Sequence, residues 1–170
     1  RPFHQSIYGF KPHLVQAALD AGHKKIVLLD PSMIILGKLD KFQSLASERG
    51  VLAFEDCLLN GAISNKCLQY FGVSRESLGE KRLVGGSFYY FDFDTALCRT
   101  IFDEWKSAEA AGIYGSQHEL SFAGLQGHRA DEAVMSMLLY KHGQSPLPGE
   151  SLKLLQEPEP AFQKKHHYKY

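Results

Sequence analysis

The stretch "HKKIVLLDPSMII", residues 23–35, decides the predicted fold of this chain. From residue 25 to residue 29 it is almost wholly apolar, and it then ends in Asp30, a proline and Ser32. Apolar residues at consecutive positions are typical of a strand that is covered on both faces, as in α/β sheets. The stretch therefore predicts a buried strand over residues 25–30 with an acid at its carboxyl end.

Helices are expected on both sides of this strand. Residues 11–22 have Pro12 in the first turn and Gly22 as the stop, and residues 39–50 end at Gly50. Further strands are expected over residues 51–56 and 83–93, further helices over residues 65–72, 95–112 and 131–143, and a long loop over residues 113–128. Because strands and helices alternate, the expected fold class is α/β with a mainly parallel central sheet and flanking helices.

The 170 residues, 44% of them apolar, suit a single domain over residues 1–150. Prolines from residue 146 onward predict an irregular tail over residues 151–170. Nineteen basic and nineteen acidic residues cancel, which argues against nucleic acid as a partner. Three cysteines without metal-ligand spacing predict reduced thiols and a cytoplasmic location, and no apolar run is long enough to form an integral membrane segment. The chain starts at Arg1 rather than Met, so a fragment or a processed product is expected.

Asp30 is the first candidate site residue, because ligands of parallel α/β sheets collect at the carboxyl ends of strands. A short acid can equally close a turn by bonding its own backbone. Ser32 adds a second oxygen, and the two side chains could face one hard cation and the phosphates that it holds. Asp92 and Asp94 have the same spacing, but Asp94 also suits the N-cap of the helix that follows.

The densest polar cluster is "GHRADE", residues 127–132, where the long loop enters the last helix. Asp131 in the first turn is favoured by the helix dipole, so a simple capping role is one explanation. His128 and Arg129 indicate more, because an arginine fork fits phosphate or carboxylate and a histidine can ligate a metal or move a proton. Lys11 at a helix start could attract an anion, although such lysines are often merely solvated.

The ordered segments "YGFKP", "IVLLDPS", "SNKCLQYFG", "VGGSFYYFDFDTA" and "GHRADEAVMSMLLYKHG" resemble glycosyltransferases of the GT-A type, the nucleotide-diphospho-sugar transferases. The resemblance covers residues 7–143. It implies a GT-A-like (Rossmann-like) single domain that transfers a sugar from a nucleotide-diphospho-sugar donor to a carbohydrate or other hydroxyl acceptor. It also implies a divalent cation, manganese or magnesium, that holds the diphosphate at a strand-end DxD motif.

Within this resemblance Asp30 matches the first acid of the motif and is the expected metal ligand, whereas Ser32 stands at the second acid. Asp131 matches the residue that faces the transferred sugar and is the catalytic candidate, with Glu132 in place of the usual glutamine. The residues expected to bind the donor are Lys11, Asp30, Ser32, Gly85, Gly86, His128 and Arg129, of which the two glycines resemble a turn that lines the acceptor side. The chain has barely twenty-five residues before the DxD strand, where GT-A domains usually carry a nucleotide-binding strand and helix.

Two other functions compete with a transferase. A non-catalytic module that binds a nucleotide sugar or a carbohydrate would explain the missing second acid. A phosphatase-like hydrolase built around "LLDPS" would need an acid where Ser32 stands.

Overall fold

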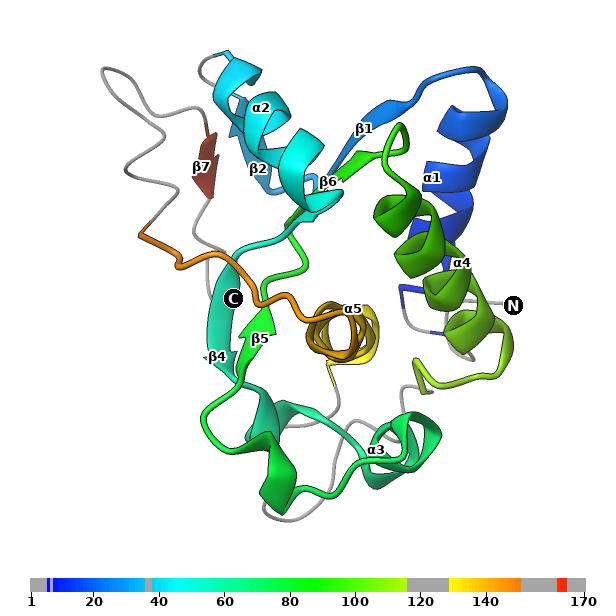
Figure 1. Cartoon of the computed structure of the whole chain (residues 1–170), viewed down its shortest axis with the longest axis vertical. Helices are drawn as coiled ribbons and strands as arrows, with labels where there is room; N and C mark the ends of the chain where they lie inside the picture. Colours follow the sequence, from blue (N-terminus) through cyan, green and yellow to red (C-terminus); the bar gives the residue numbers. More distant parts are fainter. Residues whose placement is uncertain (1–5, 7, 36–37, 116–128, 151–161, 165–170) are drawn as a thin grey trace, which may run out of the picture.

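The computed structural model describes residues 6, 8–35, 38–115, 129–150 and 162–164 of the chain. The helices are α1 (Phe10–Asp20), α2 (Asp40–Arg49), α3 (Asn65–Phe71), α4 (Ala96–Ala110) and α5 (Ala130–Lys141), with short 3₁₀ turns η1 (Leu59–Ala62) and η2 (Glu76–Leu78). The strands are β1 (Lys25–Leu29), β2 (Met33–Ile35), β3 (Val51–Leu52), β4 (Glu55–Leu58), β5 (Arg82–Val84), β6 (Phe88–Asp92) and β7 (Phe162–Lys164). Figure 1 shows α5 end-on near the centre, with β5, α3 and α4 around it.

The central sheet has the order β1-β6-β3, and both pairings are antiparallel. The register of the first pair runs from Lys25 opposite Asp92 to Leu29 opposite Phe88. The two smaller sheets, β4-β5 and β2-β7, are antiparallel as well. The expected mainly parallel central sheet, and with it the Rossmann-like arrangement of strands, is therefore wrong.

The reason lies in which strands become neighbours. Because β1 and β3 both run antiparallel to β6, they point the same way, as the alternation β1, α2, β3 predicts. A strand from much later in the chain, β6, lies between them and reverses every pairing. The alternation of strands and helices along the sequence correctly predicts that β1 and β3 point the same way. It gives no sign that β6 inserts between them.

Two strands that the sequence predicts as continuous each break into two. Residues 51–56 divide into β3 and β4, and residues 83–93 divide into β5 and β6, in each case between different sheets. The breaks face each other, since the backbone N–H of Gly85 donates to the carbonyl of Phe54 at 2.7 Å. The short strand β7 also lies within the tail for which the prolines predict no regular structure.

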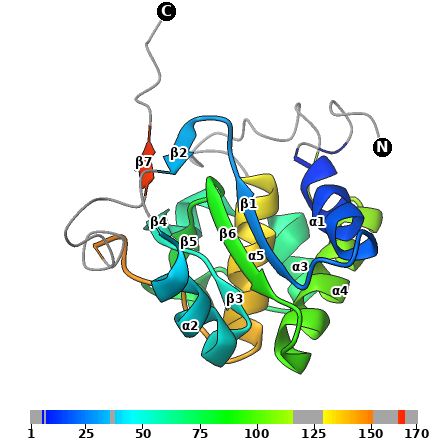
Figure 2. The same ribbon diagram turned by 90° about the horizontal axis from the view of Figure 1, so that it is seen from above.

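The sheet is covered on both faces, but β1 is its edge strand and only Ile26 of β1 is fully buried, so the expectation of a buried strand over residues 25–30 is wrong for β1 itself. Tyr89, Phe91 and the residue after the strand, Phe93, point into a large core formed with α1, α3, α4 and α5. Phe88 and Tyr90 point the other way, into a smaller core with Phe42 of α2. Figure 2 shows α2 and α5 on opposite sides of β6. All five residues of β6 are buried, so β6 is the central strand of the fold.

The predicted helices are present with the expected ends. The Ser64 hydroxyl accepts a hydrogen bond from the Cys67 N–H at the start of α3, and Gly72 ends that helix in the left-handed conformation. Thr95, rather than Asp94, caps α4 in the same way. Within the described ranges no helix is long and apolar enough to cross a membrane.

Candidate functional site

Lys11 is the centre of a polar cluster at the end of the central sheet where β1 ends and β6 begins. Its side chain is only 3% exposed, and its Nζ donates to the carbonyl oxygen of Gly86 at 2.8 Å and to Oδ2 of Asp131 at 2.9 Å. Oδ1 of Asp30 lies 3.6 Å from the same nitrogen. Groups from α1, from the end of β1, from the turn before β6 and from α5 therefore meet at one ammonium.

The backbone brings these groups together because two helices begin here. Lys11 is in the first turn of α1 and Asp131 is in the first turn of α5. Asp30 is held at the sheet edge by its own N–H, which donates to the carbonyl of Ser87 at 3.0 Å. Helix N-termini carry partial positive charge, so two helix dipoles add to the lysine at this place. The cluster therefore favours carboxylates and other anions.

Asp131 is the most buried member of the cluster, with 1% of its side chain exposed. The hydroxyl of Tyr89 donates to its Oδ2 at 3.2 Å, whereas its buried Oδ1 has no hydrogen-bond partner in the described part of the chain. Burial raises the pKa of Asp131 from 3.8 to about 6, although the Lys11 ammonium acts in the opposite direction. The carboxylate is thus held charged at neutral pH chiefly by Lys11.

Burial alone would lower the pKa of Lys11, but the charges of Asp131 and Asp30 outweigh it and raise the pKa above the ordinary value. The ammonium also lies 4.7 Å from the ring centroid of Tyr8 and 5.6 Å from that of Tyr89. Such cation–π contacts favour the charged form further. Lys11 is therefore a permanent positive charge inside the protein.

Gly86 connects the Lys11–Asp131 pair to a second ion pair, that of Arg129 and Glu132. Its N–H donates to Oε1 of Glu132 at 2.9 Å, and Oε2 of Glu132 lies 2.6 Å from Nε of Arg129. A Cβ at Gly86 would come within 2.7 Å of Glu132 and 3.1 Å of the Lys11 nitrogen. Only glycine fits between these two side chains without displacing one of them. At Gly85 a Cβ would make ordinary contacts of 3.7 and 3.8 Å.

Ala130, between Arg129 and Asp131, has a φ of +36°. Positive φ costs a residue with a Cβ roughly 1–2 kcal/mol. The start of α5 is therefore held in a strained conformation, and such strain often accompanies functional positions.

Two charged groups of the cluster face solvent. Asp30 is 36% exposed and Arg129 is 45% exposed, with Nη2 of Arg129 at 3.6 Å from Oδ2 of the equally exposed Asp56. A ligand from solution would meet this carboxylate and this guanidinium first, with Lys11 and Asp131 beneath them.

The fit of a divalent cation depends on Asp30 and Ser32. Asp30 presents one accessible carboxylate, and Ser32 follows in the turn into β2. Among the residues that the structure describes, no three His, Cys, Asp or Glu side chains are grouped so that they could hold a metal ion. Asp30 and Ser32 carry oxygens of the kind that magnesium accepts, but Oδ1 of Asp30 lies 3.6 Å from the Lys11 ammonium, so a cation here would take most of its ligands from phosphates and water.

The structure brings together five of the residues singled out in the sequence, namely Lys11, Asp30, Gly86, Arg129 and Asp131. Gly85 pairs with Phe54 through its backbone, and His128 lies outside the described residues. Asp92 and Asp94 are at the opposite end of β6, where Oδ1 of Asp92 accepts from the N–H of Asp94 at 3.0 Å, as in a turn.

Tyr89 was not predicted as a site residue. It stands in a run of strand aromatics, and nothing in that run distinguishes the one hydroxyl that bonds to Asp131 from ordinary core packing. The sequence marks Glu132 only as a replacement for glutamine, yet its carboxylate accepts hydrogen bonds from both the Gly86 N–H and Nε of Arg129.

No family model, no curated protein and no solved structure shows significant similarity to this chain.

Proposed function

We propose that this chain is a glycosyltransferase domain that transfers a sugar from a nucleotide-diphospho-sugar donor to an acceptor hydroxyl. One observation carries the proposal: Lys11 and Asp131, 120 positions apart, meet each other, Asp30 and Gly86 at one end of the sheet. These are residues on which the sequence resemblance depends. The antiparallel sheet removes support from fold class, so the proposal rests on this cluster.

The donor diphosphate would bind at the exposed side of the cluster. Arg129 offers a planar fork of N–H donors to phosphate, and the N-termini of α1 and α5 add positive potential. A divalent cation, when bound between Asp30, Ser32 and the diphosphate, would supply positive charge for the departing nucleoside diphosphate. The buried Lys11 would add a fixed charge in a place that excludes water, where electrostatic stabilisation is strongest.

Asp131 would act on this reaction through Lys11. Its carboxylate is buried and bonded to the lysine and to Tyr89, so in this conformation it faces no acceptor. Its predicted role toward the transferred sugar would require the start of α5 to move. The observed geometry supports a positioning role instead, in which Asp131 keeps the ammonium at Gly86 and Asp30.

The test is titration calorimetry of the whole chain with uridine, guanosine and adenosine diphospho-sugars, with and without manganese. Asp30→Asn should abolish the metal-dependent part of donor binding while the urea midpoint falls only modestly, because Asp131 still pairs with Lys11. Asp94→Asn is the matched control, because Asp94 is an exposed acid at the other end of β6. Unchanged donor affinity in Asp30→Asn would contradict the proposal.

A non-catalytic module that binds the same nucleotide sugars is the second candidate. The burial of Asp131 favours it, because the carboxylate predicted to meet the sugar is occupied by Lys11. Product analysis after incubation with the bound donor and simple sugar acceptors distinguishes the two. Binding with neither transfer nor donor hydrolysis identifies the module.

A further inference from the structure

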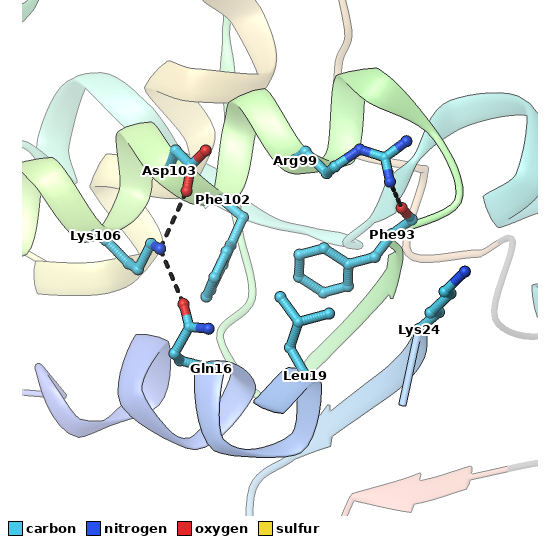
Figure 3. A pocket seen from close by; sticks show the side chains of 8 residues that line it. All are labelled: Gln16, Leu19, Lys24, Phe93, Arg99, Phe102, Asp103 and Lys106. Carbon is cyan, nitrogen blue, oxygen red and sulfur yellow. Dashed lines mark hydrogen bonds and ion pairs between the residues drawn. The ribbon is translucent and has the colours of Figure 1, made fainter. Parts of the chain in front are cut away.

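A hollow of about 240 Å³ lies between α1 and α4, near the end of β6 that is remote from the Lys11 cluster (Figure 3). The side chains that line it are Gln16, Leu19, Lys24, Phe93, Arg99, Phe102, Asp103 and Lys106. None of these residues belongs to the proposed donor site. The hollow is therefore a separate feature of the molecule.

The inner wall of the hollow is apolar. The rings of Phe93 and Phe102 are buried in the core and meet edge to face, with centroids 5.1 Å apart. Leu19 of α1 faces them across the space in Figure 3. Phe93 is 2% and Phe102 1% exposed, so a hydrophobic group that entered here would pack mainly on the half-buried Leu19 and would contact only a small part of the two rings.

The rim is positively charged, with three cations against one carboxylate. Arg99 gives its hydrogen bonds to the backbone carbonyls of Phe93 and Asp94, and in the described part of the chain no carboxylate pairs with it. A guanidinium has five N–H donors, so several remain for a ligand. The positive charge of Arg99 is thus fixed over the apolar wall but not neutralised.

The other two cations are less available than Arg99. Lys24 is exposed and lies 3.5 Å from Oδ1 of Asp94. Lys106 is held by Asp103 at 3.1 Å and by the amide oxygen of Gln16 at 2.9 Å, with its Nζ 4.7 Å from the Phe102 ring centroid. The acid of a ligand would therefore meet the Arg99 and Lys24 side of the hollow.

We propose that this hollow binds a small organic acid that carries one apolar group. The aromatic or branched aliphatic group would pack on Leu19 and on the small part of Phe93 and Phe102 that the hollow leaves exposed, and its carboxylate or phosphate would bind Arg99 and Lys24. The volume sets the size, because pockets for drug-sized ligands have about 300–1,000 Å³. The hollow takes a single ring and its acid, and a nucleotide sugar is too large for it.

The experiment is an NMR titration of the whole, isotopically labelled chain with phenylacetate and with phenyl phosphate. Acetate, inorganic phosphate and benzyl alcohol are the matched probes, since they present the acid without the ring and the ring without the acid. The backbone amides of Leu19, Phe93, Arg99 and Lys106 should shift with the two aromatic acids and remain nearly unchanged with the other three probes.

Variants test which side chains make the site. Arg99→Gln should weaken the binding of the aromatic acids by about tenfold or more, because one charge-assisted hydrogen bond is lost. Lys24→Gln should weaken this binding less. Lys41→Gln, on the surface of α2, should leave the affinity for the aromatic acids unchanged. Tighter binding of phenyl phosphate than of phenylacetate, read from the titration curves, would identify phosphate as the preferred acid, and the reverse would identify carboxylate. Equal binding of benzyl alcohol, insensitivity to Arg99→Gln or the absence of any shift at these amides would overturn the proposal.

Discussion

Lys11 and Asp131 form a buried ion pair, with Nζ 2.9 Å from Oδ2, that ties the first turn of α1 to the first turn of α5. The pair joins two residues that lie 120 positions apart in the sequence. Because both charges are removed from water, each depends on the other to remain charged. The pair is therefore both the basis of the proposed site and a structural connection.

Lys11→Met should strongly destabilise the protein. Among the described residues it leaves the buried Asp131 carboxylate bonded to the Tyr89 hydroxyl alone, and removing one partner of a buried pair costs about 3–5 kcal/mol. Urea unfolding at pH 8 measures the loss, and Lys41→Met on the exposed face of α2 is the control. The double variant Lys11→Met/Asp131→Asn should recover most of the loss. A loss below about 1 kcal/mol in Lys11→Met would show that the pair is not buried as described.

Gly86→Ala should destabilise the protein through steric overlap with Glu132, without any change of charge. The new Cβ would lie 2.7 Å from Glu132, so the Glu132 side chain must move and give up its bond to the Gly86 N–H. Overpacking of this kind costs about 1–3 kcal/mol in the free energy of unfolding. Gly85→Ala is the neighbouring control and should cost less, because its Cβ meets atoms at 3.7 Å or more. Equal effects of the two substitutions would refute the role assigned to Gly86.

The sequence predicted the local elements better than their assembly. The ends of the helices at Gly50 and Gly72 are set by a few neighbouring residues, and the structure confirms them, whereas the cap of α4 falls on Thr95 and not on Asp94. The neighbour of β1 is set by packing over long distances, since β6 inserts between β1 and β3 and makes the sheet antiparallel. Short apolar runs carry no signal of which partner they will meet.

The same distinction holds for the candidate site. Lys11, Asp30 and the segment from Arg129 to Glu132 are recognisable from the sequence because they stand at predicted helix starts and at a predicted strand end, where anions and ligands bind. Their roles were harder to predict, because burial decides them. Nothing in "HRADE" indicates that Asp131 is 1% exposed while Arg129 is 45% exposed.

The raised pKa of Asp131 makes a prediction about stability and pH. Between pH 3.8 and about 6 the folded protein holds a proton that the unfolded chain has released. This proton stabilises the folded state at low pH. The stabilisation is lost as the pH rises through this range, and at higher pH the contribution of Asp131 to the free energy of unfolding no longer changes. The difference of about two pKa units corresponds to about 3 kcal/mol.

Other carboxylates contribute to the pH profile of the whole protein, so the measurement is a difference between two proteins. The free energy of unfolding of the natural chain, minus that of Asp131→Asn, should fall by up to about 3 kcal/mol from pH 4 to pH 7. Urea unfolding at half-unit pH steps gives the curve. A difference that is flat with pH, or that rises, would mean that Asp131 titrates in its ordinary range.

Arg129→Lys tests the exposed side of the site. Arg129 holds Glu132 through Nε at 2.6 Å and keeps the rest of its fork near Asp56 and the solvent. Lysine keeps the positive charge but can form neither the fork nor both contacts at once. If the fork binds the donor diphosphate, the substitution should weaken nucleotide-sugar binding by about tenfold, the equivalent of about 1.4 kcal/mol. Stability should change little, because exposed ion pairs contribute at most about 1 kcal/mol.

The control for Arg129→Lys is Arg49→Lys on α2, whose guanidinium bonds to the backbone carbonyl of Ser145, away from the cluster. Calorimetric titration of both variants with the nucleoside diphosphate alone and with the whole nucleotide sugar separates the phosphate contribution from that of the sugar. A loss that is equal for both ligands places Arg129 at the diphosphate, and a loss seen only with the sugar places it nearer the transferred group. If Arg129→Lys binds both ligands as tightly as Arg49→Lys does, Arg129 serves only to hold Glu132 and Gly86 in place.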